Sequence, residues 1–154
     1  MDARLIQELE IREAGAADLP LVLPIFGQLG MDDGRVLDAA GARALFEKMR
    51  RYPDYRLYTA ILDGQVMGAF VLLIMDNFAH LGAPSGIVED VVVREGWRGK
   101  GIGAAMMRFA MALCREKNCY KMVLSSNRNR DDAHRFYRSM GFETHGYSFG
   151  VDIE

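Results

Sequence analysis

The sequence predicts an α/β fold of the α+β kind, in which helices pack against a mixed β-sheet. Residues Tyr55–Leu62 and Gln65–Met75 form two β-rich runs joined by a two-residue turn, which is typical of a hairpin. Further on, a helical pattern over about 101–118 separates the apolar run Ile87–Val93 from the run Lys121–Ser125. Strand, helix and strand in that order indicate a parallel pair in the middle of the sheet. In total we expect about six to seven strands and about four helices.

The chain before the hairpin contains the pattern of one strand and two helices. Alternation over Glu8–Glu13 predicts a first strand. Asp18–Pro20 is typical of a helix start, with Asp as N-cap and Pro in the first turn, and this helix would end near Gly30. A second helix is expected over about 35–51. It ends there because Pro53 cannot continue it.

The hairpin turn, Asp63-Gly64, supplies the positive φ angles that a two-residue loop needs. A loop over 76–86 then leads into the central strand Ile87–Val93. A last helix is expected over Arg130–Met140, with Gly141 as its stop. Two further strand candidates complete the sheet, Phe142–Thr144 and Tyr147–Ile153.

Composition limits the class of protein. The chain has 154 residues, of which 50% are hydrophobic and 26% charged, so we expect a single domain over 1–154. A net charge of −2 gives no reason to expect nucleic acid as a partner. No apolar run approaches the roughly 20 residues of a membrane span, and Met1–Arg4 is not followed by a signal core, so we expect a soluble, cytoplasmic protein without membrane contact. Two cysteines and three scattered histidines indicate neither a disulfide framework nor a metal site.

Residues Arg98–Gly103 are the most informative segment, because three glycines lie between the central strand and the following helix. Glycines at such a junction let backbone N–H groups approach an anion, and the helix N-terminus adds a partial positive charge. Arg98 and Lys100 add formal countercharge. The segment therefore predicts a phosphate-binding turn.

Two other phosphate-binding turns fit this segment poorly. Residues Gly99–Ala104 formally match the dinucleotide pattern Gly-x-Gly-x-x-Ala, but five residues separate Gly99 from the strand and only 51 residues follow Gly103. A Walker A loop is excluded, because Lys100 is followed by glycine and not by Ser or Thr.

Two motifs in the same chain carry a family resemblance. Arg98, Gly101 and Gly103 resemble the Arg/Gln-x-x-Gly-x-Gly/Ala motif of the GNAT superfamily of acetyl-CoA-dependent N-acetyltransferases. Phe136-Tyr137 with Gly141-Phe142 resembles the Phe-Tyr-x-x-x-Gly-Phe segment of the same family. The order of elements agrees from about residue 9 onward, so the resemblance covers nearly the whole chain.

The resemblance implies acetyl-CoA as co-substrate, bound where the two central parallel strands splay apart. The pantetheine arm would pair with the backbone of the central strand, and the glycine turn would hold the pyrophosphate. Asn127 would add a polar contact, although it is equally suited to shape a turn. The implied cofactor-binding residues are Val91, Val92, Val93, Arg98, Gly99, Lys100, Gly101, Ile102, Gly103, Ala104 and Asn127.

The resemblance also suggests the catalytic groups. Tyr137 is the candidate acid that protonates the coenzyme A thiolate, or else it packs on a helical stripe. Glu89 is the candidate base, or else it orients the amine by charge. Strand alternation predicts that Glu89 shares a face with Val91 and Val93 and that Asp90 points to the opposite face. The oxyanion would meet a backbone N–H of the central strand.

The acceptor side remains open in the sequence. The family builds it from the loop between the first two helices and from the last strands, which here supply Asp32, Asp33, Tyr147 and Phe149. We expect a small-molecule or peptide amine, attacked directly in a ternary complex without a metal or a covalent enzyme intermediate, and we expect that the chain forms a homodimer. The alternative is a non-catalytic acyl-CoA-binding sensor or regulatory module.

Overall fold

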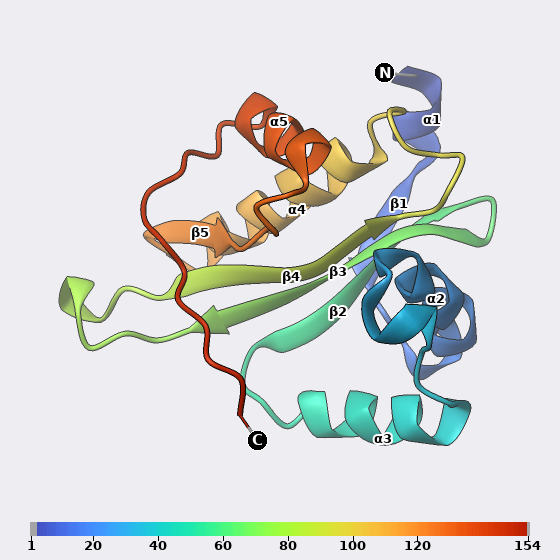
Figure 1. Ribbon diagram of the computed structural model, residues 1–154, viewed down its shortest axis with the longest axis horizontal. Helices are drawn as coiled ribbons and strands as arrows, with labels where there is room; N and C mark the ends of the chain where they lie inside the picture. Colours follow the sequence, from blue (N-terminus) through green and yellow to red (C-terminus); the bar gives the residue numbers. More distant parts are fainter. Residues whose placement is uncertain (1–2, 154) are drawn as a thin grey trace. The chain divides into compact units, whose positions relative to one another are not determined.

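The computed structural model describes residues 3–153 and divides them into two compact units, one up to Val123 and one from Leu124 onward. Met1, Asp2 and Glu154, which the single-domain prediction includes, lie outside the described residues. The helices and strands, labelled in Figure 1, are α1 Ala3–Glu8, β1 Glu10–Glu13, α2 Leu19–Phe26, α3 Ala39–Met49, β2 Tyr55–Leu62, β3 Gln65–Met75, β4 Ser85–Val93, α4 Ile102–Glu116, β5 Lys121–Leu124 and α5 Asp131–Ser139. None of the helices in residues 3–153 is long and apolar enough to cross a bilayer.

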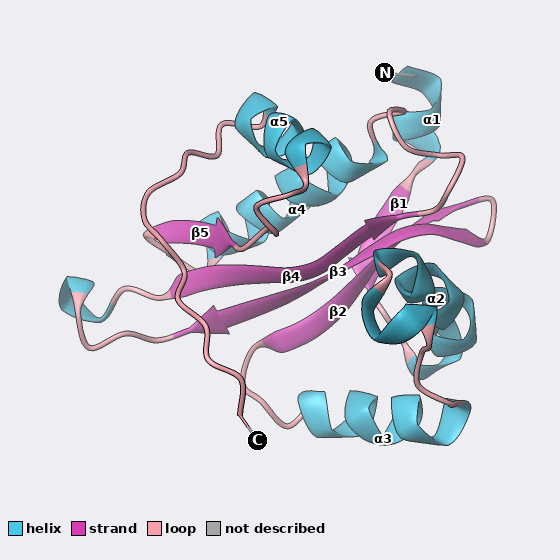
Figure 2. Cartoon of the chain, in the orientation of Figure 1, coloured by secondary structure: helices cyan, strands magenta, loops and turns pink. Residues whose placement is uncertain are grey.

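The sheet is mixed and has the strand order β1-β2-β3-β4-β5. Strands β1 to β4 pair antiparallel, whereas the arrows of β4 and β5 point the same way in Figure 2. The hairpin between β2 and β3 has the predicted bounds and turns at Asp63 and Gly64, whose φ angles are +49° and +74°. The parallel pair is therefore confirmed at β4 and β5, with α4 as the crossover.

Helices cover both faces of this sheet (Figure 1). On one face, Val22 of α2 and Phe46 of α3 are buried in a cluster with Val71 and Val92 of the sheet. On the other, α4 packs so closely that a methyl group on Gly68 would lie 3.0 Å from the Met106 sulfur. Such close packing fixes the position of α4, and therefore of the glycine turn before it, relative to β4.

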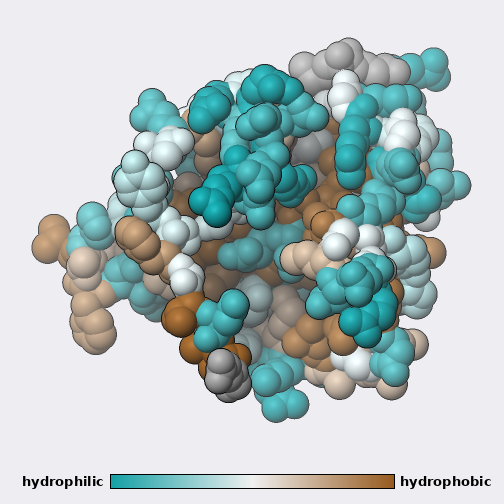
Figure 3. All heavy atoms as spheres, viewed as in Figure 1, coloured by the Kyte–Doolittle hydropathy of each residue, from teal (hydrophilic) through white to brown (hydrophobic). Residues whose placement is uncertain are grey.

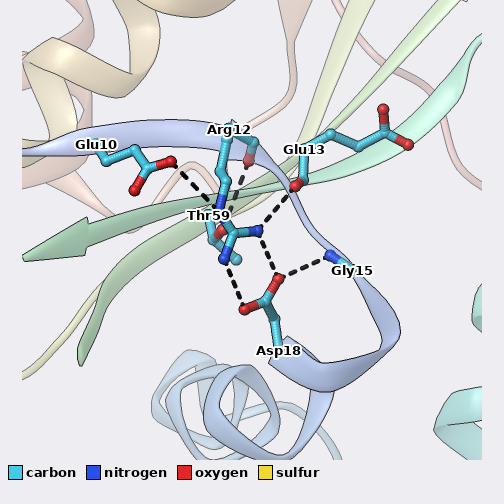
Figure 4. Close-up of polar contacts among 6 residues, drawn as sticks. All are labelled: Glu10, Arg12, Glu13, Gly15, Asp18 and Thr59. Carbon is cyan, nitrogen blue, oxygen red and sulfur yellow. Dashed lines mark hydrogen bonds and ion pairs between the residues drawn. The ribbon is translucent and has the colours of Figure 1, made fainter. Parts of the chain in front are cut away.

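Arg12 of β1 ties the first strand to the start of α2 (Figure 4). Its guanidinium forms two hydrogen bonds to the Asp18 carboxylate, of 2.8 and 3.1 Å, and the Gly15 N–H donates to the same carboxylate at 2.7 Å. The Arg12 contact lowers the pKa of Asp18. Asp18 occupies the predicted N-cap position of α2, with proline in the first turn, but its side chain makes no cap bond and is held instead by Arg12.

The predicted counts need correction. In residues 3–153 the structure has five strands and five α-helices, not six to seven strands and four helices. The predictions do not include helix α1, because they assign no element before Glu8, and Glu8 itself ends α1 and does not begin a strand. The last two strand candidates, Phe142–Thr144 and Tyr147–Ile153, form no strand, and within the described chain no hydrogen bond involves residues 143–153. Alternation alone does not make a strand when no partner strand accepts its backbone groups.

Candidate active site

A β-bulge in β4 shapes the centre of the candidate site. Val92 pairs with Ala69 and Glu89 pairs with Val71, so that Asp90 and Val91 together face the single residue Phe70 of β3. Asp90 takes the extra position with a φ of +54°, a left-handed conformation that Asp tolerates better than most residues. The bulge shifts the side-chain alternation by one residue from this point on.

This shift overturns the predicted alternation of β4. The pairing with β3 places Glu89 on the same face as Val92, the face covered by α2 and α3. Val93 pairs with Gly68, which lies against Met106 of α4, so Glu89 and Val93 are on opposite faces. The prediction that Glu89 shares a face with Val91 and Val93, with Asp90 opposite, assumed an unbroken pleat and is wrong.

Glu89 and Asp90 form a pair of neighbouring carboxylates. Burial raises the pKa of Glu89, and the adjacent Asp90 charge raises it further. Burial also raises the pKa of Asp90. The two carboxylates together help to raise the pKa of Tyr55, so the phenol lies within their field. No cation of the described chain forms an ion pair with either carboxylate. A positively charged group placed here would relieve their mutual repulsion.

The segment between β4 and α4 is fixed at its first residues. The backbone N–H of Arg94 donates to Met67 O at 2.7 Å, and its side-chain Nε donates to Val66 O at 2.8 Å. The N–H of Glu95 donates to the Gln28 side chain at 2.9 Å. The turn that follows therefore begins from a fixed point, although Arg98, Gly99 and Lys100 are themselves exposed.

The glycine turn leaves the first amides of α4 without protein partners. Gly101 precedes the helix with a φ of +92°, and Gly99 has a φ of +75°, conformations that favour glycine. Elsewhere in the described chain, no backbone carbonyl accepts from the N–H groups of Ile102, Gly103 or Ala104. Free amides at a helix N-terminus are suited to bind an anion.

Two cations flank these amides. Neither Arg98 nor Lys100 forms an ion pair within residues 3–153. The Lys100 ammonium lies 4.7 Å from the centre of the Trp97 ring, a cation–π contact that limits where it can reach. Two unpaired cations therefore precede the free amides of α4, and the role of Arg98–Ala104 in binding the cofactor stays a prediction.

The C-terminal half of β4 has an open edge. The N–H of Tyr120 donates to Pro84 O at 3.0 Å, and Met122 lies against Gly86, so β5 runs beside the first residues of β4. Strand β5 has four residues and β4 has nine. At about 3.3 Å per residue, β5 ends before Val91–Val93. The backbone groups of these three valines on that side are available to an extended ligand.

The second unit contains Asn127 and Tyr137. The Asn127 side-chain oxygen accepts from the Asn129 N–H at 2.9 Å, so it shapes a turn, and a role toward the cofactor stays a prediction. Tyr137 of α5 contacts the rings of Phe136 and Phe142, with centroids 5.2 and 5.6 Å away. Burial raises the pKa of Tyr137, so its hydroxyl keeps its proton at neutral pH.

The cysteines are poor nucleophiles. Burial raises the pKa of Cys114 to about 12 and also raises that of Cys119. Because the thiolate is the reactive form, neither side chain is activated for a covalent mechanism.

Sequence reasoning missed Asp90 as a site residue. Its side chain lines a cavity together with Asp32 of the segment Met31–Gly34, which the sequence had placed on the acceptor side. Asp33 does not line it. The signal was weak, since an Asp inside a β-branched run is compatible with a left-handed bulge position but does not require one.

Comparison with known proteins agrees with this geometry. Residues 27–142 match the model of the acetyltransferase (GNAT) family. The glucosamine 6-phosphate N-acetyltransferase of Trypanosoma brucei brucei is 27% identical over 155 residues, which cover 96% of this chain and 98% of the relative. The aminoalkylphosphonate N-acetyltransferase of Salmonella typhimurium is 28% identical, covering 91% of this chain and 88% of the relative. A putative acetyltransferase from Agrobacterium tumefaciens has a similar structure, with a TM-score of 0.87, 31% identity and coverage of 94% and 99%.

Proposed function

The chain belongs to the GNAT family of acetyltransferases and is an N-acetyltransferase, and from this premise we propose that it takes its acetyl group from acetyl-CoA bound at β4 and the glycine turn. The observation that carries the proposal is the set of unpartnered amides of Ile102, Gly103 and Ala104 behind the left-handed Gly101. These amides would hold the pyrophosphate, with Arg98 and Lys100 supplying charge.

The pantetheine arm would extend along the open edge of β4. Its amide groups would hydrogen-bond to the backbone of Val91–Val93 in the way an added strand does. An arm bound in this way would bring the thioester to the bulge, next to Glu89 and Asp90. We keep Asn127 as a weaker candidate contact, because its side-chain oxygen already accepts from Asn129.

The reaction we propose is direct attack of the acceptor amine on the thioester carbonyl carbon. The new C–N bond forms as the C–S bond breaks, and coenzyme A leaves as a thiolate. Glu89 receives the proton that the amine loses, directly or through a water, and its raised pKa makes it a better base than an ordinary carboxylate. The Val91 or Val92 N–H would stabilise the oxyanion.

Tyr137 would donate its phenolic proton to the departing thiolate. Its raised pKa keeps the phenol protonated at neutral pH, so that it can donate as negative charge develops on the sulfur. The raised pKa values of both cysteines support a ternary complex without an acetylated enzyme.

We propose a small-molecule primary amine as the acceptor. The two relatives above are named for glucosamine 6-phosphate and for an aminoalkylphosphonate, both small amines. A peptide amine is the second candidate. The non-catalytic sensor is not favoured, because the relatives are named as acetyltransferases.

Calorimetric titration with acetyl-CoA tests the cradle. Gly101→Asp places a carboxylate at the helix N-terminus and a side chain on a backbone with a φ of +92°. We expect the Kd for acetyl-CoA to rise at least about tenfold, or about 1.4 kcal/mol. Gly64→Asp is the matched control, because it adds the same side chain at a φ of +74° in the hairpin turn. Unchanged affinity of Gly101→Asp would remove the glycine turn from the cofactor site.

Release of free coenzyme A in the presence of a panel of amines tests turnover. We expect release that depends on acceptor concentration. Tight binding of acetyl-CoA without release for any amine would favour the sensor instead.

We further propose that the whole chain is one domain and that two copies associate through its last segment. Four apolar side chains at alternating positions are 82 to 92% exposed there: Tyr147, Phe149, Val151 and Ile153. Figure 3 shows such apolar atoms standing on the surface along the segment that leads to the C-terminus. A segment with an exposed apolar side chain at every second position is suited to pair with a second copy. Light scattering should give a dimer, and the double variant Phe149→Asp, Val151→Asp should be a monomer; a dimer that survives both changes uses another surface.

The single domain is tested by calorimetry, which should give one unfolding transition. Two separate transitions would contradict it.

A further inference from the structure

A cavity of about 500 Å³ lies between Asp90 of β4 and the chain from α2 to the segment before α3. Its wall is mostly apolar, and three of the side chains that line it, Met31, Val36 and Leu37, are 57, 43 and 48% exposed. Apolar side chains gathered around a hollow and left in contact with water are typical of a binding site. Only three charged residues line it, Asp32, Arg35 and Asp90.

One carboxylate that lines the cavity belongs to Asp90. Its carboxylate has no ion-pair partner in residues 3–153, and it neighbours Glu89, which has none either. An ammonium group that enters the cavity would therefore meet an uncompensated carboxylate at the bulge of β4.

The cationic residue that lines the cavity is Arg35. Its Nε donates to the backbone oxygen of Asp32 at 3.0 Å, and this bond orients the guanidinium. No carboxylate of the described chain forms an ion pair with Arg35, so its terminal nitrogens are free to donate. A fixed guanidinium with two free donors is suited to bind a carboxylate or phosphate in a forked geometry.

We infer that this cavity takes a small primary amine that also carries an anionic group, with Asp90 holding the ammonium and Arg35 holding the anion. The inference rests on the proposed function, because it places the amine of the acceptor beside the bulge where the thioester would lie. The cavity volume of about 500 Å³ suits a small molecule. A carboxylate and a phosphate offer Arg35 the same chemistry.

Other amines match the wall less well. A polyamine satisfies Asp32 and Asp90 but brings a second cation toward Arg35. A neutral-bodied amine fills the apolar wall but leaves the guanidinium without a partner. A molecule with both charges pairs with Asp90 and with Arg35, which neither of the other amines does.

Matched pairs of acceptors test the inference by acetyl-CoA-dependent release of coenzyme A. O-phosphoethanolamine is compared with ethanolamine, and β-alanine with propylamine, so that each pair keeps its amine and differs in the anion. We expect the anionic member to have a kcat/KM at least about tenfold higher. Arg35→Gln should remove this preference by raising the KM of the anionic member about 10- to 100-fold.

The variants separate Arg35 from general effects of charge. Arg35→Lys should keep part of the preference, and Arg43→Gln, an exposed guanidinium of α3 that does not line the cavity, should keep all of it. Asp90→Asn should raise the KM of both members of a pair, because both carry the ammonium. Acetyl-CoA affinity should stay unchanged in Arg35→Gln.

The outcomes distinguish the two proposals. Equal use of both members, a preference that survives Arg35→Gln, or spermidine as the better acceptor overturns the inference and leaves acetyl transfer standing. If no amine is acetylated, calorimetry of O-phosphoethanolamine with the coenzyme A-loaded protein decides, and absence of binding overturns the inference alone. If acetyl-CoA itself does not bind, the proposed function fails.

Discussion

The role of Tyr137 is tested by Tyr137→Phe, which removes one hydroxyl and keeps the ring. The ring carries the packing, since it lies 5.2 Å from the centre of Phe136 and 5.6 Å from that of Phe142. No hydrogen bond of the Tyr137 hydroxyl occurs within the described residues. The free energy of unfolding should therefore change by less than about 0.5 kcal/mol.

The effect on turnover should be much larger. A positioned acid contributes a factor of about 10² to 10⁴, so kcat should fall at least about 100-fold, which corresponds to about 2.7 kcal/mol of barrier. The Kd for acetyl-CoA should stay within about twofold, because the hydroxyl acts on the thiolate only as the C–S bond breaks.

Steady-state coenzyme A release, calorimetric titration and urea unfolding measure these three quantities on the same protein. Tyr52→Phe removes a hydroxyl of the same kind from an exposed ring and should change none of them. If Tyr137→Phe keeps the wild-type kcat, Tyr137 is a packing residue and another group protonates the thiolate.

Three further predictions follow from the charged groups. In the wild type, the acidic limb of the pH profile of kcat should lie above the ordinary pKa of 4.5, because the base must be ionised and burial raises the pKa of Glu89. Glu89→Gln should abolish this limb. An unchanged profile would remove Glu89 as the base. Asp18→Asn should cost about 1 to 3 kcal/mol of stability at neutral pH, since Asn keeps one acceptor oxygen but loses the second bond to Arg12 and the negative charge. Because the pKa of Asp18 is lowered in the folded state, its contribution to stability is present above the unfolded pKa of about 4 and is lost as pH falls through the folded pKa. The free energies of unfolding of variant and wild type, measured in urea, should therefore converge in acid. A difference in stability that persists there would assign the loss to packing. Asp90→Gly should stabilise the fold by about 0.5 to 1 kcal/mol, because glycine adopts a φ of +54° without strain, while the KM for the amine rises; a destabilised variant would show that the carboxylate has a structural role.

Local patterns predicted the parts of the fold that depend on local chemistry. The hairpin had the right bounds, because its two strands alternate and Asp63-Gly64 has few other uses. The α4 helix and its glycine turn were also predicted from the sequence, since a strongly amphipathic run follows the glycines. Helix α1 was missed because it buries no residue, and a short helix without a buried face leaves no periodic signal.

What the sequence could not predict depends on contacts between distant residues. Apolar residues do alternate over Tyr147–Ile153, but whether this segment forms a strand depends on a partner strand that the local pattern does not specify. The cavity is a second case, because Asp90 and Arg35 are far apart in sequence and line the same cavity only when β4 is placed against the chain after α2. No spacing rule joins them.

The bulge in β4 explains why two carboxylates, those of Glu89 and Asp90, are candidates for the site where the sequence indicated one. In an unbroken strand, Glu89 and Asp90 would lie on opposite faces of the sheet, and only one of them could approach a bound amine. The extra residue at Asp90 lets its side chain line the cavity, while Glu89 stays on the face that α2 and α3 cover. It also holds Asp90 at a φ of +54°, a conformation that costs free energy in the absence of substrate. The two neighbouring carboxylates can then divide the work that the sequence assigned to Glu89 alone, Asp90 binding the ammonium form and Glu89 removing its proton. On this reasoning Asp90→Asn should act mainly on KM and Glu89→Gln mainly on kcat, and a reversed pattern would exchange their roles.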